Sequence, residues 1–319
     1  MKENLIRRTW TGKWIEPVQE PAYREPELTF EEMVAAEQSG IPGEEHLKCA
    51  KHLHRVIKAE NADGELPVSA VLYASAHGVY DLYINGAKAD QRLLAPETTN
   101  YKKLLWYQKY DISDRVCESD RICVDVLLGD GWWIGHLGMS GANCNYGSKL
   151  GFLMDLELTY PDGSVTVIGS DEQFLSCDSF IRYSDLFVGE MQDGRAFDFI
   201  DGSRGCPPRE SIMDDQFRVR EYEDEPNVVS PGWKNCVCAK HAMDILAQQT
   251  QAPVQVIREI PSQGYVDNPA KDLIADFGQV LAGPVRIRVR GERGAQITIE
   301  HGEVLDRSEE HTSELQSRI

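Results

Sequence analysis

Short stretches in which apolar and polar residues alternate recur along most of this chain. Alternation with a period of two puts the apolar side chains on one face of a strand, so each stretch predicts a half-buried β-strand. These stretches are residues 52–59, 69–75, 79–85, 106–111, 122–128, 152–160 and 165–168. Asn85-Gly86 and Pro161-Asp162-Gly163 are turn sequences that predict hairpins. Many short strands joined by such turns predict an all-β protein, an antiparallel β-sandwich of the jelly-roll kind.

One segment, residues 28–38, has a helical pattern instead. Thr29 and Glu32 have the spacing of a capping box, and Phe30, Met33 and Val34 follow at helical spacing. A glycine and a proline follow the segment and end the pattern. The sequence therefore predicts one short helix before the first strand.

Charge and cysteine content narrow the class of protein. Acidic residues number 52 and basic residues 33, which gives a net charge of −19. Such a surface repels phosphate groups, so we expect no nucleic acid and no membrane among the partners. The chain has no run of about 18 apolar residues and no apolar signal segment near its start. Its eight cysteines show no disulfide-like spacing, and we predict a cytoplasmic protein with reduced thiols.

Two close pairs of metal-ligand residues occur, Cys236 with Cys238 and His52 with His54. A single pair without further ligands at a suitable spacing is weak evidence for a metal. We interpret the cysteines as structural thiols and the histidines as solvent-facing residues on one face of a strand. We predict no metal ligand from either pair.

The most distinctive motif is LLGDGWWIG, residues 127–135. A strand ends at Gly129-Asp130-Gly131 and delivers Trp132 and Trp133 to a loop. Two adjacent indoles suit the apolar face of a sugar, but indoles also cap sandwich cores, and the residues alone leave both interpretations open. The glycines approximate a dinucleotide motif, but no βαβ pattern surrounds them, which argues against nucleotide binding.

Polar and aromatic residues gather around this motif and around residues 183–195. Indoles, carboxylates, amides and one guanidinium together could form a carbohydrate site. The candidate substrate-binding residues are Asp130, Trp132, Trp133, Asn143, Asn145, Asp185, Glu190, Asp193 and Arg195. Aspartate and asparagine also form turns, so a structural role for the same residues stays open.

The order of several short motifs resembles the N-terminal region of bacterial α-L-rhamnosidases. The motifs are YDLYING (80–86), LAPETTNYKKLLWYQKYDIS (94–113), LLGDGWWIG, YGSKLGFLMDLELTYPDGS (146–164) and YSDLFVGEMQDGR (183–195). Two more, DFGQVLAGPVRIRVRG (276–291) and ITIEHGEVLD (297–306), resemble the start of the next sandwich of those enzymes. The resemblance covers roughly residues 68–306, and its specificity comes from the order of the motifs.

This resemblance implies a division of the chain. Residues 1–67 would form an N-terminal extension with the short helix and the first strand, and residues 68–245 a sugar-binding-like β-sandwich. Residues 251–306 would begin a second, concanavalin-like sandwich, with residues 285–290 and 296–300 as a hairpin. Because these few strands leave a sheet edge and an apolar face uncovered, we expect this part to be disordered or aggregation-prone on its own. Residues 307–319 resemble a translated sequencing adapter, and we exclude them from the functional argument.

The resemblance also implies a function. It suggests the non-catalytic part of an α-L-rhamnosidase, an inverting glycoside hydrolase that removes terminal α-L-rhamnose from glycosides. In the family, both catalytic carboxylates lie in a helical barrel that follows this region, so we predict no catalytic residue here. The partners would be that barrel and a rhamnose-containing carbohydrate, bound with or without calcium. A stand-alone carbohydrate-binding module and a structural spacer are the alternatives.

Overall fold

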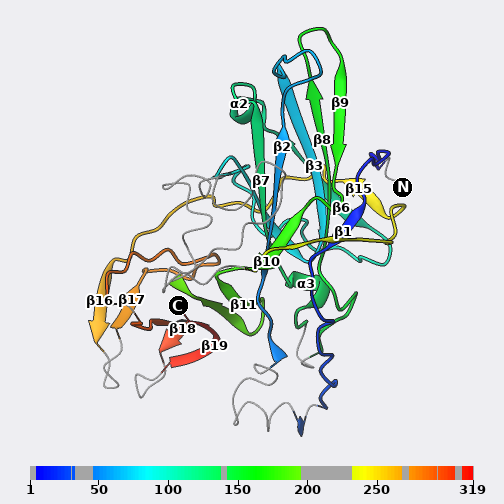
Figure 1. Cartoon of the computed structure of the whole chain (residues 1–319). Coiled ribbons are helices and arrows are strands. Elements are labelled where there is room, and N and C mark those ends of the chain that lie inside the picture. The colour runs from blue at the N-terminus through cyan, green and yellow to red at the C-terminus, as the bar shows by residue number, and fades with distance from the viewer. Residues whose placement is uncertain are drawn as a thin grey trace.

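A computed structural model shows an almost entirely β-structured protein (Figure 1). It describes residues 5–29, 31–32, 46–137, 142–194, 232–267, 273–292, 294–305 and 311–318. Two helices are described over their whole length, and both are single turns, α2 (Ser113–Val116) and α3 (Gly131–Ile134). No described helix is long and apolar enough to cross a membrane.

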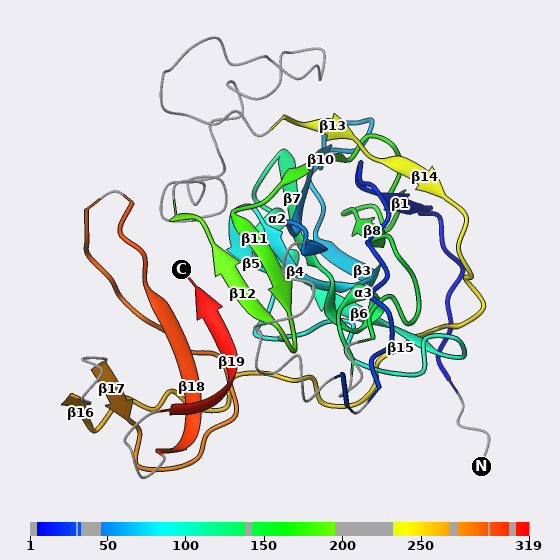
Figure 2. The same cartoon turned by 90° about the horizontal axis from the view of Figure 1, so that it is seen from below.

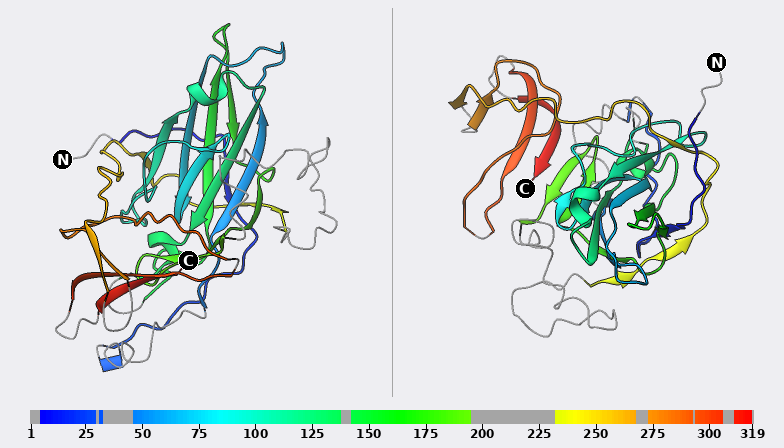
Figure 3. Two further views of the ribbon diagram at one scale, coloured as in Figure 1. Left: turned by 90° about the vertical axis from the view of Figure 1, so that its left-hand side faces the viewer. Right: turned by 90° about the horizontal axis from the view of Figure 1, so that it is seen from above.

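Two sheets form the sandwich, and their long strands stand side by side in Figure 3. The first sheet has the order β14 (Val237–Ala239), β1 (Trp14–Glu16), β8 (Gly151–Thr159), β3 (Ser69–His77), β6 (Leu105–Asp111) and β15 (Leu246–Gln248), with β9 (Val165–Gly169) paired to β8. The second has the order β13 (Lys234–Asn235), β10 (Leu175–Asp178), β2 (Lys51–Lys58), β7 (Arg121–Gly129), β4 (Val79–Ile84) and β5 (Ala87–Lys88). Strands β1 and β2 therefore join residues 1–67 to both sheets of the sandwich.

The hydrophobic core lies between these sheets because alternate residues of each strand point inward. Leu72 and Ala74 of β3, Val126 of β7 and Phe152 of β8 are fully buried there. Leu153, the next residue along β8, belongs to a second cluster with Trp14, Tyr101, Leu105, Tyr107 and Leu246. Because neighbouring residues of a strand point to opposite faces, this second cluster covers the outer face of the first sheet.

Two smaller sheets lie beside the sandwich (Figure 2). One has the order β11 (Ile181–Asp185), β12 (Gly189–Gln192), β19 (His311–Arg318) and β18 (Thr298–Leu305). The other pairs β16 (Gly264–Asp267) with β17 (Leu273–Asp276). Large apolar side chains near these sheets are exposed, among them Ile257 at 95% and Val280 at 72%. Residues 251–306 thus leave apolar side chains exposed, and their disorder or aggregation on their own stays a prediction.

The predicted sandwich strands and hairpins are confirmed to within a few residues. Asn85 and Gly86 have φ values of 50° and 80° in the turn between β4 and β5, and Gly163 has a φ of 82° between β8 and β9. The capping box is also present, because the Glu32 backbone N–H donates to Thr29 Oγ1 at 3.3 Å and the Thr29 N–H donates to Glu32 at 2.8 Å. Of the predicted helix, the structure describes only the first residues.

Three local predictions were wrong. The two tryptophans lie in the helical turn α3 rather than in an irregular loop. Residues 189–231 are acidic, contain glycine and proline and lack an apolar–polar period, which predicts long loops, but the segment begins with strand β12. Residues 285–290 form no strand, and β18 pairs with β12's neighbour β19 instead of closing the predicted hairpin. Alternation of apolar and polar residues marks a possible strand, but pairing with a neighbouring strand decides whether the strand forms.

Candidate functional site

Sequence-distant polar residues meet in a cavity where α3, β11 and the N-terminal segment come together below the long strands (Figure 1). Its walls include three of the predicted binding residues, Asp130, Asn143 and Asp185. The other polar lining residues include Glu25, His46, Lys48, Lys51 and His136. The volume is about 30 Å³, which accommodates one or two water molecules or a hydroxyl group of a ligand. We call this the polar cavity.

His136 and Asp185 form the best-defined pair in the polar cavity. Asp185 Oδ2 accepts hydrogen bonds from the His136 backbone N–H at 2.8 Å and from His136 Nδ1 at 2.9 Å. Asp185 Oδ1 accepts two more from the backbone N–H groups of Phe187 and Val188, at 2.8 and 3.0 Å. The loop after β11 and the segment that follows α3 therefore fold around one carboxylate.

The electrostatics of this pair follow from these contacts. Burial raises the pKa of Asp185, but the hydrogen bonds from His136 and from the backbone outweigh it, and the net change is downward. Burial lowers the pKa of His136, but the bond to Asp185 and its negative charge outweigh this, and the pKa rises. His136 is only 7% exposed, and its Nε2 atom has no partner within the described chain. A buried ring nitrogen on a cavity wall is a site for a polar ligand atom.

Asp130 is the second carboxyl group in the polar cavity. Burial, and to a smaller extent the negative charge of the nearby Asp185 carboxylate, raises the pKa of Asp130 to about 7. The positive charges of His136, Lys48 and Lys51 act in the opposite direction. With its pKa raised in this way, the Asp130 carboxyl can donate a hydrogen bond to a hydroxyl group when it is protonated and accept one from it when it is ionised.

Asn143 and Asn145 serve the local backbone. Asn143 Oδ1 accepts a hydrogen bond from the Glu25 N–H at 2.9 Å, and Asn143 Nδ2 donates to the Tyr23 carbonyl at 2.8 Å. Asn145 Nδ2 donates to the Ala142 carbonyl at 3.4 Å. Asn143 thus fastens the N-terminal segment to the cavity, while Asn145 stabilises a turn.

The two tryptophans differ in their surroundings. Trp133 stacks on His77, with ring centroids 3.8 Å apart and planes at 4°, and Tyr101 and Tyr146 lie nearby. Trp133 Nε1 is buried without a partner in the described chain. Trp132 is half-buried against the cluster on the outer face of the first sheet. One face of Trp133 is therefore covered by protein, and its use as a sugar platform stays a prediction.

The remaining predicted residues lie away from the polar cavity. Glu190, on β12, accepts hydrogen bonds from Ser184 Oγ at 2.9 Å and from the Gln192 side chain. The Asp193 backbone N–H donates to the Phe180 carbonyl at 2.8 Å. Arg195 lies outside the described residues. The structure thus unites part of the predicted set and leaves Glu190 on strand β12 and Asp193 just after that strand.

The polar cavity does not fit a calcium ion. Calcium takes six to eight oxygen ligands, whereas both Asp185 oxygens and the Asn143 oxygen already accept N–H groups. Lys48 and Lys51 also line the cavity, and their charges oppose a cation.

Sequence reasoning missed His136 and the contribution of the N-terminal segment. His136 follows the tryptophan motif directly, and that proximity was its only signal. Tyr23, Glu25 and Lys48 are more than 80 residues from Asp130 in sequence. Only the folded chain brings them to the same cavity.

The paired histidines were also misjudged. His52 and His54 are buried rather than solvent-facing, and both lie 2.8 Å from Asp125 Oδ1. The outer face of the second sheet is covered at this point, which the alternation of β2 cannot reveal. Of the other pair, Cys236 is buried and Cys238 is exposed.

Comparison with known proteins gives matches in two consecutive regions. The α-L-rhamnosidase N-terminal domain matches residues 65–200, and the bacterial α-L-rhamnosidase concanavalin-like domain matches residues 267–318. The α-L-rhamnosidase of Streptomyces avermitilis is 29% identical over 237 residues, which cover 74% of this chain and 21% of that protein. The chain thus spans about a fifth of the length of this relative.

Solved structures agree. The crystal structure of the Streptomyces avermitilis α-L-rhamnosidase complexed with L-rhamnose matches with a TM-score of 0.72 and 25% identity, covering 86% of this chain and 25% of that one. The Aspergillus terreus α-L-rhamnosidase shares the fold, with a TM-score of 0.75 and 23% identity over 97% of this chain and 31% of that one. These matches define a β-sandwich region of the type that α-L-rhamnosidases carry in their N-terminal part. The chain belongs to the bacterial α-L-rhamnosidases and corresponds to their N-terminal part.

Proposed function

We propose that this chain is the non-catalytic N-terminal region of an enzyme that hydrolyses terminal α-L-rhamnose from glycosides. The observation that carries the proposal is the order of two α-L-rhamnosidase domains along one chain. The general acid and the general base would lie in the part of the relatives that this chain does not cover. Within the whole enzyme this region supports the neighbouring domains and takes part in recognising rhamnose-containing substrates.

The recognition role is assigned to the polar cavity. A sugar hydroxyl is both a donor and an acceptor, and it finds a carboxyl of pKa about 7 at Asp130 and the open Nε2 atom of His136. The volume of about 30 Å³ admits such a hydroxyl but not a whole sugar ring. The ring would therefore lie at the mouth of the cavity, where Tyr23 and Lys48 are exposed.

A spacer role without a ligand is the second candidate. The specific observation in its favour is that Trp133 and Asn143 both make contacts that hold the sandwich together. In that case the polar cavity holds only water, and the region contributes stability alone.

Two measurements test the proposal. The chain, and the full product of its gene, are assayed with an aryl α-L-rhamnoside, with an aryl β-D-glucoside as the control. We expect hydrolysis of the rhamnoside by the full product and none by the chain. Turnover by the chain would refute the non-catalytic assignment, and a full product inactive on the rhamnoside would refute the parent activity.

Recognition is tested by calorimetric titration of the chain with L-rhamnose. We expect His136→Gln to weaken binding about tenfold, which corresponds to the loss of one hydrogen bond of about 1.4 kcal/mol. Glu190→Gln is the matched control, because Glu190 was predicted from the same sequence pattern but lies outside the polar cavity. Equal weakening by both variants would contradict the assignment to the cavity. No binding by the unaltered chain would favour the spacer.

A further inference from the structure

The outer face of the second sheet carries a cluster of metal-ligand side chains that the rhamnosidase assignment does not use. Strands β2 and β7 pair antiparallel, and His54 is directly opposite Asp125 in their register. Cys123 lies two residues before Asp125 and so points to the same face. Leu53, Val124 and Val126 alternate with them and face the core. The three side chains therefore meet on the side of the sheet away from the sandwich interior.

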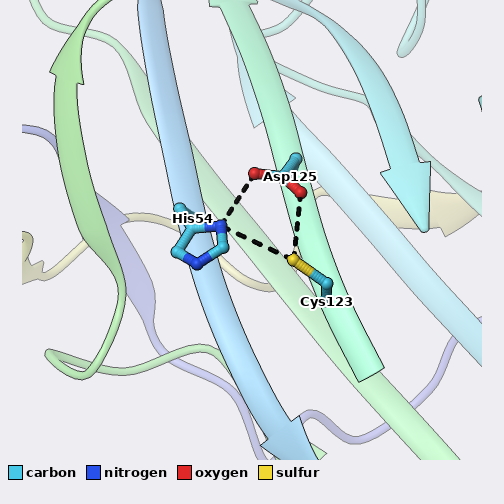
Figure 4. A group of neighbouring side chains, drawn as sticks. All are labelled: His54, Cys123 and Asp125. Carbon is cyan, nitrogen blue, oxygen red and sulfur yellow. Dashed lines mark hydrogen bonds and ion pairs between the residues drawn. The ribbon is translucent and has the colours of Figure 1, made fainter. Parts of the chain in front are cut away.

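The contacts within this cluster are short (Figure 4). His54 Nδ1 lies 2.8 Å from Asp125 Oδ1 and 3.7 Å from Cys123 Sγ, and Cys123 Sγ lies 3.3 Å from Asp125 Oδ2. His52 Nε2 is also 2.8 Å from Asp125 Oδ1. One carboxylate thus holds two imidazoles and one thiol around itself.

The cluster is shielded from water, although it lies on an outer face. His52, His54, Cys123 and Asp125 are all buried. The indole of Trp233 packs on both imidazoles, with ring centroids 5.0 Å from His52 and 5.7 Å from His54. Asp125 Oδ1 is the shared partner of both imidazoles, and an aspartate carboxylate in this position can bind a metal ion.

We propose that His54, Cys123 and Asp125 bind a divalent transition metal ion of the zinc class. In a tetrahedral zinc site with usual bond lengths, the ligand atoms are about 3.4 to 3.6 Å apart. The sulfur atom is 3.7 Å from the imidazole nitrogen and 3.3 Å from the carboxylate oxygen, close to those separations. His54 Nδ1 and Asp125 Oδ1 are now hydrogen-bonded at 2.8 Å. To bind the same ion, these two atoms would have to move apart by about 0.6 Å more.

The ligand types select the metal. Thiolate and imidazole are soft and borderline ligands that favour zinc over calcium or magnesium. The thiolate and the carboxylate together neutralise a divalent cation. Binding releases the Cys123 thiol proton to solvent, and the proton of neutral His54 moves from Nδ1 to Nε2, so that Nδ1 can bind the metal. His52 would not bind the metal itself. It contacts the Asp125 carboxylate and holds it in place, as residues that hydrogen-bond to zinc ligands commonly do. Among the described residues, this is the one group of three such side chains close enough to share an ion.

The site would link two central strands of the sheet. A metal-free alternative is a closed network in which the thiol and the imidazoles simply donate to Asp125. The metal site and the metal-free network can be told apart by experiment, because a hydrogen-bonded network binds no metal and is not stabilised when metal is added. A metal site stabilises the folded state in proportion to the logarithm of the free metal concentration.

The test uses the full chain, reduced with a metal-free phosphine and stripped with a chelator. Cobalt(II) is added as the spectroscopic probe and zinc(II) as the competing ion. We expect about one equivalent of cobalt to bind, with a thiolate-to-cobalt charge-transfer band that zinc abolishes. Zinc at about 100 times its dissociation constant is expected to raise Tm by about 5 to 10 °C.

Matched variants locate the ligands. Cys123→Ser is expected to abolish the charge-transfer band and the rise in Tm, whereas Cys177→Ser, which removes a buried thiol from adjacent strand β10, keeps both. If Cys123→Ser does not fold, Asp125→Asn takes its place, because the amide preserves the shape and is expected to weaken binding at least tenfold. Absence of a band in the unaltered chain, or a band that survives Cys123→Ser, overturns the proposal.

Discussion

The indole of Trp133 lies parallel to the imidazole of His77, and the other face of that imidazole lies on Trp14, with centroids 4.0 Å apart at 16°. Burial, with a smaller effect of His241, lowers the pKa of His77 to about 2, so the ring between the indoles is neutral. This stack joins α3 to strands β3 and β1. The helical turn that carries the tryptophans is therefore fixed to the first sheet by ring packing.

Truncation of Trp133 should destabilise the protein. Trp133→Ala removes an indole that packs against both hydrophobic clusters, and we expect the free energy of unfolding to fall by about 3 kcal/mol. Urea denaturation measures the change. Tyr265→Ala, at a side chain that is 64% exposed, is the control and should change it by less than about 0.5 kcal/mol. A Trp133 variant as stable as the control would show that the stack contributes little.

A single methyl group at Gly147 should disturb the same stack. A Cβ atom there would lie 2.3 Å from Trp133 Nε1, and a rigid indole cannot move away without leaving His77. We expect Gly147→Ala to cost about 1 to 3 kcal/mol and to shift the tryptophan emission spectrum. Gly264→Ala is the matched control, because nothing lies within 4 Å of a Cβ atom at that position. Identical emission spectra for the two variants would contradict this prediction.

Asp130 should make stability depend on pH. Its pKa is raised from 3.8 to about 7 in the folded state, so the folded state binds more protons between these values and stability falls as pH rises. Asp130→Asn removes this dependence. We expect the variant to be more stable than the unaltered protein at pH 8 by on the order of 4 kcal/mol, and equally stable near pH 3.5. Thermal unfolding across this range measures the difference, and a gap that does not change with pH would count against the raised pKa.

Replacement of Asp185 should destabilise the protein, in contrast to replacement of Asp130. Asp185→Asn replaces an oxygen that accepts two N–H groups from His136 with a donor, and we expect a loss of about 3 kcal/mol. The lowered pKa of Asp185 supplies stability above pH 3.8 that is lost as pH falls, and the raised pKa of His136 supplies stability below pH 6.5 that is lost as pH rises. The difference between variant and unaltered protein should therefore be greatest between these values.

Urea denaturation from pH 3 to 9 measures that window, and NMR titration of His136 should show its pKa falling in the variant. Glu190→Gln, on strand β12 outside the polar cavity, is the control and should leave both quantities unchanged. A constant loss at every pH would indicate a steric effect of the amide rather than the loss of an ion pair.

Prediction from sequence succeeded where structure is local. Alternation placed the long strands, and Asn85-Gly86 and Pro161-Asp162-Gly163 placed their hairpins, because φ values above zero at turn residues are encoded by residue type. It failed at β12, which pairs with β11 and with the distant strand β19, and at residues 285–290, which alternate in sequence but form no strand. The histidines of β2 were placed on one face correctly, but their exposure was predicted wrongly, because alternation does not show what covers a sheet.

The sequence by itself determined an all-β sandwich, the family through the order of its motifs, and part of the candidate site in Asp130, Asn143 and Asp185. These follow from local periodicity, turn chemistry and residue order. Only the tertiary structure decided that His136 joins Asp130, that Trp133 lies against His77, and that Cys123 meets His54 across two strands. Burial and the approach of residues distant in sequence set these contacts, and both arise from packing of the whole chain.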